Sequence, residues 1–159
     1  MDTRAAQLAA SFERANDAVI AAITRCSESQ LRAACDGETW PVVVTAHHVA
    51  VNYPAFADMV QRLANGEPLP ALTMEQLDAM NAQHADQSAN VSREETVALL
   101  RREGQAVAEL VRGLTDAQLD RSGAFGLAGG EPWSAADMIE RGLIGHALGH
   151  GQSIRGAAA

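Results

Sequence analysis

Four of the five histidines in this chain stand in two close pairs, His146 with His150 and His47 with His48. Residues four apart on a helix point the same way and lie one turn apart, so His146 and His150 could present two imidazoles to one metal ion. A third imidazole from another helix would complete a three-histidine face and leave coordination positions open. An open position is where chemistry or ligand binding can take place, so these residues are the first candidates for a functional site.

Hydrogen bonding without any metal is the competing interpretation of the same histidines. Burying an imidazole without a partner costs roughly 1–3 kcal/mol, but a carbonyl or hydroxyl group can satisfy a single one. Two imidazoles on one helix face are harder to satisfy in this way. Adjacent helical residues differ in direction by about 100°, so His47 and His48 cannot both point inward. The periodicity of the apolar residues does not show which of these two histidines points inward.

Apolar residues recur at helical spacing in the segments that must position the histidines. Long helices are predicted over residues 2–25, 40–63, 92–114 and 134–155, and a shorter one over 73–89. We expect Thr39 to cap the second helix and Gly104 to mark a close approach between helices. Ile139, Leu143, His146, His150 and Ile154 form one stripe, which predicts core positions for both histidines. The glycine-rich residues 122–132 are expected to form a loop.

Composition favours an all-α fold for these segments. Apolar residues make up 47% of the 159 residues, but aromatic residues only 4%, and β-branched runs are nearly absent. This length suits a single domain over residues 1–159. We therefore predict an up-down four-helix bundle with short extra helices.

Charge and hydropathy exclude several classes of partner. The net charge of −8 disfavours nucleic acid and anionic lipid, which are bound by clustered Lys and Arg. No apolar stretch reaches about 18 residues, and no signal peptide is recognisable, so we expect neither a membrane span nor secretion. The two cysteines, Cys26 and Cys35, follow no metal or redox spacing. They are expected to be free thiols, which indicates a cytoplasmic protein.

The order and spacing of several motifs resemble the DinB-like four-helix-bundle superfamily, which includes mycothiol-dependent maleylpyruvate isomerases and other thiol-dependent transferases. Members open the second helix with a Trp and place a metal-binding His eight positions later, as Trp40 and His48 do here. Their other two ligands form an H-x-x-x-H motif followed by Gly-Gln, matched by residues 146–152. The resemblance covers nearly the whole chain. It implies that His48, His146 and His150 are the metal ligands.

The same resemblance implies a divalent ion, zinc or nickel, that activates a low-molecular-weight thiol against a small electrophile. It is also compatible with a homodimer. The isomerases carry a second domain and must hold a dicarboxylate, whereas this chain has no room for that domain and no Arg cluster, so we do not expect maleylpyruvate isomerisation. The alternative function is a non-catalytic metal-binding or stress-associated bundle that binds a small ligand. Whether His47 or His84 contributes to the site is left open.

Overall fold

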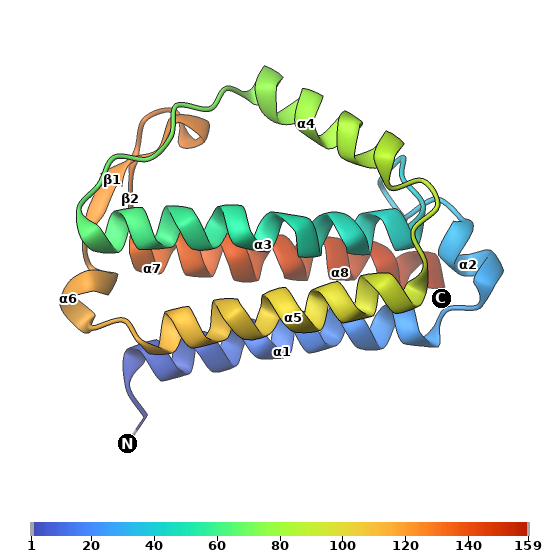
Figure 1. Ribbon diagram of the computed structural model, residues 1–159, viewed down its shortest axis with the longest axis horizontal. Coiled ribbons are helices and arrows are strands. Elements are labelled where there is room, and N and C mark those ends of the chain that lie inside the picture. Colours follow the sequence, from blue (N-terminus) through green and yellow to red (C-terminus); the bar gives the residue numbers. More distant parts are fainter. Residues whose placement is uncertain (1, 159) are drawn as a thin grey trace.

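The structure, a computed structural model, describes residues 2–158 (Figure 1). The helices and strands in chain order are α1 (Arg4–Arg25), α2 (Glu28–Arg32), α3 (Val42–Asn65), α4 (Met74–Gln87), α5 (Arg93–Arg112), α6 (Asp116–Leu119), β1 (Ser122–Ala124), the 3-10 turn η1 (Gly126–Ala128), β2 (Pro132–Ser134), α7 (Ala135–Asp137), the π-helical segment η2 (Met138–Ile144) and α8 (Gly145–Ala158). The predicted long helices are therefore all present.

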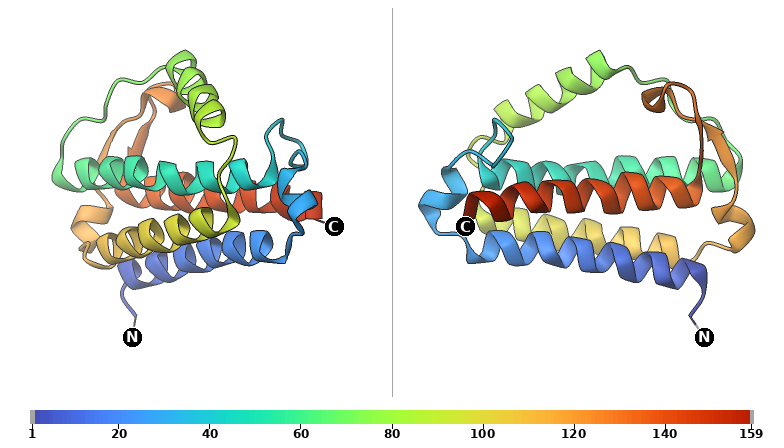
Figure 2. Two further views of the ribbon diagram at one scale, coloured as in Figure 1. Left: turned by 45° about the vertical axis from the view of Figure 1, so that its right-hand side comes forward. Right: turned by 180° about the vertical axis from the view of Figure 1, so that it is seen from behind.

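The long helices form the predicted all-α four-helix bundle with short extra helices. α1 packs against α5 and α8, and α3 packs against the same two helices, so α1 and α3 lie diagonally (Figures 1 and 2). Directions do not alternate along the chain as in a simple up-down bundle, because α3 and α5 run the same way. The reason is that residues 66–73 and α4 carry the chain back along the bundle before α5 begins.

α3 lies centrally in the fold, in contact with α5, α8, η2 and α4. All five residues of its first stretch, 42–46, are buried. Thr39 does not cap it, however, and Pro41 occupies the N-cap position. The chain is held extended up to that point by a bridge between Ala34 and Pro41 and by the bond from the Cys35 N–H to the Trp40 carbonyl (2.8 Å). The helix therefore cannot begin at Trp40.

The last helix differs from expectation in its first half. α7, η2 and α8 follow one another without a break, and η2 is π-helical rather than α-helical. The prediction that His146 and His150 occupy core positions is wrong. Ala147, Gly151 and Ile154 form the buried stripe of α8, and both histidines are half-buried. The small Ala and Gly side chains let α8 lie close to α1, which turns the histidines toward α3 instead.

Two peripheral segments complete the fold. α4 has no buried residue and crosses above α3 and α8 (Figure 1). Residues 122–134, whose glycine-rich part was expected to be a loop, form an antiparallel hairpin in which Gly123 pairs with Trp133. Within residues 2–158, no helix combines the length and the apolar character needed to cross a bilayer.

Candidate metal centre

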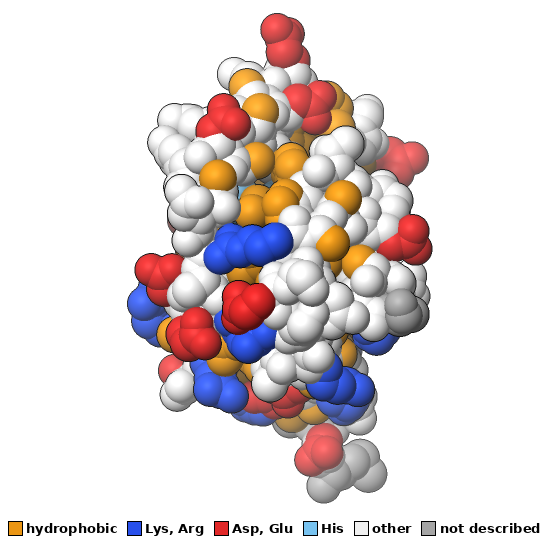
Figure 3. Space-filling view, turned by 90° about the vertical axis from the view of Figure 1, so that its right-hand side faces the viewer, with side chains coloured by type: hydrophobic (Ala, Val, Ile, Leu, Met, Phe, Trp, Pro, Cys, Tyr) orange, Lys and Arg blue, Asp and Glu red, His pale blue; other side chains and the backbone are white. Residues whose placement is uncertain are grey.

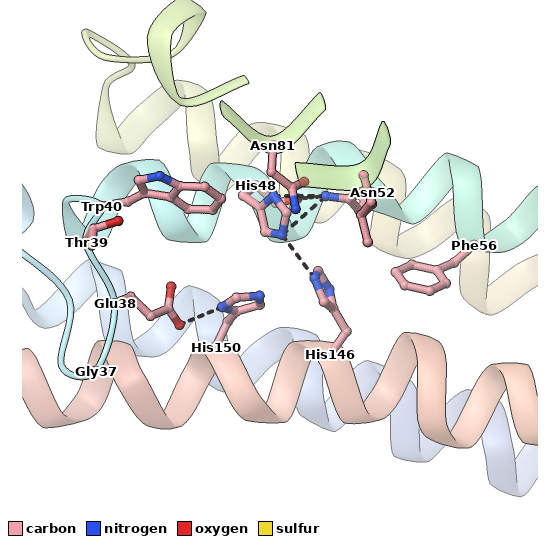
Figure 4. A pocket seen from close by; sticks show the side chains of 11 residues that line it. Gly37, Glu38, Thr39, Trp40, His48, Asn52, Phe56, Asn81, His146 and His150 are labelled. Carbon is pink, nitrogen blue, oxygen red and sulfur yellow. Dashed lines mark hydrogen bonds and ion pairs between the residues drawn. The ribbon is translucent and has the colours of Figure 1, made fainter. Parts of the chain in front are cut away.

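The structure brings His48, His146 and His150 together between α3 and α8 (Figure 4). One nitrogen from each ring lies within 4.8 Å of the other two. The Nε2 atoms of His48 and His146 are 3.1 Å apart. Two imidazole nitrogens bound to one tetrahedral zinc ion would be about 3.3 Å apart. The donor set and the spacing of this pair therefore fit a mononuclear site, although the identity of the ligands stays a prediction.

Helix geometry accounts for the two histidines of α8. His146 and His150 are one α-helical turn apart, and their ring centroids are 4.6 Å apart. The π-helical segment η2 ends at Ile144, two residues before His146. A π-helical segment inserts extra backbone into a helix and rotates the residues that follow, and such segments are frequent at functional sites. Here η2 sets the rotation at which both rings face His48.

Burial keeps two of the three imidazoles, those of His48 and His146, neutral. Burial, with a smaller contribution from the neighbouring histidines, lowers the pKa of His48 to about 3 and that of His146 to about 3. A neutral imidazole has a free lone pair, and a protonated one cannot bind a metal. At neutral pH both rings therefore hold lone pairs available to a cation.

Other side chains contact the outer edges of these rings. Glu38 Oε1 lies 2.8 Å from His150 Nδ1. The Asn52 amide nitrogen donates to the His48 carbonyl (2.8 Å) and lies 3.1 Å from His48 Nδ1. Nδ1 of His146 is buried and has no hydrogen-bond partner among the described residues. Glu38 therefore contacts one defined nitrogen of His150, whereas the amide nitrogen of Asn52 lies near both ring nitrogens of His48, 3.5 Å from Nε2.

A pocket of about 600 Å³ opens beside the three histidines. Its lining residues are Gly37, Glu38, Thr39, Trp40, His48, Asn52, Phe56, Leu77, Asn81, His146 and His150. None of them is Lys or Arg. Figure 3 shows a small area of histidine surface between hydrophobic side chains on the face that looks to the right in Figure 1. A closed structural site would have no such opening.

His47 and His84 lie outside the group of three. They form a pair of their own, with His47 Nδ1 2.8 Å from His84 Nε2 and the rings stacked at 12°. Partial burial lowers the pKa of both. The pair ties α4 to α3, so its contribution is to hold the helix that supplies Leu77 and Asn81 to the pocket.

Sequence reasoning did not single out Glu38, Phe56, Leu77 or Asn81 as site residues. Glu38 stands in a loop and Leu77 and Asn81 on a separate helix, so no spacing rule connects them to the histidines. Asn52 lies one helical turn beyond His48 on α3, and its amide nitrogen contacts that ring. Trp40 is half-buried, and its ring centroid lies 5.2 Å from that of His48.

Comparison with known proteins gives one family and one solved structure. The profile of the DinB superfamily matches residues 11–154. No curated protein matches the sequence. The solved structure is YfiT from Bacillus subtilis, described as a probable metal-dependent hydrolase with an unusual four-helix bundle topology. It superposes with a TM-score of 0.71 at 15% identity, over 99% of this chain and 86% of that chain. At this identity the likeness concerns the fold.

Proposed function

This chain belongs to the DinB superfamily, and from this premise we propose that it is a divalent-metal-dependent enzyme in which a low-molecular-weight thiol attacks a small electrophile. His48, His146 and His150 would hold the metal ion. The observation that carries the proposal is the open pocket beside three clustered imidazoles, two of which, His48 and His146, are kept neutral by burial. The family resemblance supports the same three ligands.

Zinc and nickel are both suited to imidazole ligands. Three neutral ligands leave the full 2+ charge, so the bound ion would act as a Lewis acid and lower the pKa of a thiol or water molecule in its open position. The side chains that line the pocket would shape the surroundings of the ion. They exclude bulk water from one side of the site and orient the reactants within the pocket.

The lining of the pocket supports an uncharged substrate. Trp40, Phe56 and Leu77 offer apolar surface, while Asn52 and Asn81 offer amide groups. A dicarboxylate would need cationic partners besides the metal ion, and no Lys or Arg is among the lining residues. A small neutral electrophile with an apolar body, oriented by one or two amide hydrogen bonds, fits this surface.

The description of YfiT favours a second candidate, metal-dependent hydrolysis. Water would then replace the thiol, while the ligands and the pocket would be the same. The third candidate is a non-catalytic bundle that binds metal and a small ligand. The homodimer and the cytoplasmic location stay predictions.

Metal content is the first test. Protein purified without an affinity tag should contain about one equivalent of zinc or nickel. The His48→Ala variant should lose it, and the His84→Ala variant should keep it, because His84 lies outside the three-histidine group. Wild-type protein that takes up no divalent metal from an excess would contradict all three candidates.

Turnover then separates the candidates. Metal-loaded, metal-free and His146→Ala proteins are compared with a panel of neutral electrophiles and ester substrates, with and without low-molecular-weight thiols. A rate that needs both metal and thiol supports the transferase, and a metal-dependent rate without thiol supports the hydrolase. Binding of the same compounds without turnover supports the non-catalytic bundle.

A further inference from the structure

We propose that Glu38 is a positioning residue that fixes His150 with its Nε2 atom toward the metal. The inference rests on the proposed function and adds a specific residue to it. Glu38 lines the pocket, and its Oε1 atom lies 2.8 Å from Nδ1 of His150. Both side chains are 21% exposed, so this contact is largely shielded from solvent.

The contact determines which nitrogen of His150 is available. A carboxylate oxygen only accepts hydrogen bonds, so the hydrogen of the neutral ring must be on Nδ1. Nε2 then carries the lone pair. Histidines that bind metals commonly donate their other N–H to a carboxylate, which fixes the tautomer and increases the basicity of the ligand. The Glu38–His150 pair has this arrangement.

The loop that carries Glu38 is tied to both helices of the site. The Asp36 N–H donates to the Ser153 carbonyl of α8 (3.3 Å), one turn beyond His150. On the other side, the hydroxyl group of Thr45 on α3 donates to Glu38 Oε2 (3.4 Å). Gly37, between Asp36 and Glu38, has a φ of +73°, a backbone conformation that residues with a side chain rarely adopt. The carboxylate is therefore presented by a fixed loop rather than by a mobile surface side chain.

Metal affinity tests this role without any assay of activity. Zinc binding to untagged protein is measured by competition with a chromophoric chelator in the wild type, Glu38→Gln and the control Glu131→Gln, which removes an exposed carboxylate from the hairpin. We expect Glu38→Gln to weaken zinc binding by about 10- to 100-fold and Glu131→Gln to have no effect. In a His150→Ala background, Glu38→Gln should cause no further loss, because Glu38 acts through that ring.

The tautomer of His150 gives a readout that needs no metal. In the metal-free wild type, ¹⁵N NMR should show the ring hydrogen on Nδ1, and in Glu38→Ala it should move toward Nε2. If the wild type binds zinc but Glu38→Gln binds it equally tightly, the role of Glu38 is wrong, while the proposed function stands. The same holds if the tautomer of His150 is unchanged in Glu38→Ala. Wild type that binds no zinc would overturn the proposed function and the inference together.

Discussion

The Nε2 atoms of His48 on α3 and His146 on α8 lie 3.1 Å apart. Burial keeps both rings largely neutral, so each carries one hydrogen, and a hydrogen bond between these two atoms needs that hydrogen on Nε2 of one ring and on Nδ1 of the other. Their separation is within a few tenths of an ångström of the roughly 3.3 Å expected for two nitrogens on one tetrahedral ion. Small side-chain rotations would therefore convert a hydrogen-bonded pair into a pair of ligands.

Metal binding is expected to stabilise the folded protein. A ligand that binds only the folded state at 100 times its dissociation constant adds about 2.7 kcal/mol to the free energy of unfolding. Chelator-treated protein should therefore melt at a higher temperature after zinc is added. The His146→Ala variant should not respond, whereas His84→Ala should respond as the wild type does. An equal response from His146→Ala would place the metal elsewhere.

Trp40 is expected to report on the same event by fluorescence. Its ring centroid lies 5.2 Å from that of His48, and the only other tryptophan, Trp133, is in the hairpin at the other end of the bundle. Cobalt or nickel in the site should quench Trp40 by proximity. The quenching should persist in Trp133→Phe and disappear in Trp40→Phe. Quenching that follows Trp133 would contradict the proposed location.

Helix geometry alone predicted that His146 and His150 share one face, because a spacing of four is nearly one turn. It could not say whether that face meets the core or a pocket. Which side of α8 meets the core depends on Gly151. A Cβ atom added at this glycine would lie 3.5 Å from the side chain of Val19 on α1. The small residues Ala147 and Gly151 therefore face the core, and the histidines face the pocket. The choice of His48 over His47 came from family resemblance, since both lie on apolar faces of α3.

Other parts of the site depend on contacts that no local pattern encodes. The π-helical segment before His146 looks in sequence like the start of an ordinary amphipathic helix. Glu38 reaches His150 only because a loop after α2 folds against α8. The parallel direction of α3 and α5 results from the path of α4, whose sequence predicted a helix but not its position. Each of these features is fixed by tertiary packing.

The stability of the metal-free protein should fall as the pH decreases below about 6.5. The pKa values of His48 and His146 are about 3 in the folded protein, mainly because of burial, and rise to about 6.5 in the unfolded chain. Between these values the unfolded chain binds more protons, so acid favours unfolding. Each histidine contributes a slope of about 1.4 kcal/mol per pH unit within this range.

The His146→Asn variant isolates this contribution from that of the carboxyl groups. Urea denaturation of chelator-treated protein between about pH 5 and pH 7.5 should give a shallower dependence on pH for the variant, because one fewer buried imidazole must gain a proton on unfolding. Identical slopes would show that His146 is not held neutral by its surroundings.

The close contact between Gly104 on α5 and Asn16 on α1 provides a test of the fold that is independent of the site. A Cβ atom at Gly104 would lie 2.3 Å from the Asn16 Nδ2 atom. Asn16 cannot move away freely, because its amide donates to the Leu100 carbonyl (3.0 Å) and accepts from the Tyr53 hydroxyl (2.9 Å).

Overpacking typically costs about 1–3 kcal/mol, and the better helix propensity of Ala returns about 1 kcal/mol. We therefore expect Gly104→Ala to lower the free energy of unfolding by up to about 2 kcal/mol, as measured by urea denaturation. Gly149→Ala on α8, where no atom lies within 4 Å of the new Cβ, should raise it instead. If both variants changed stability in the same direction, the predicted contact between Gly104 and Asn16 would be wrong.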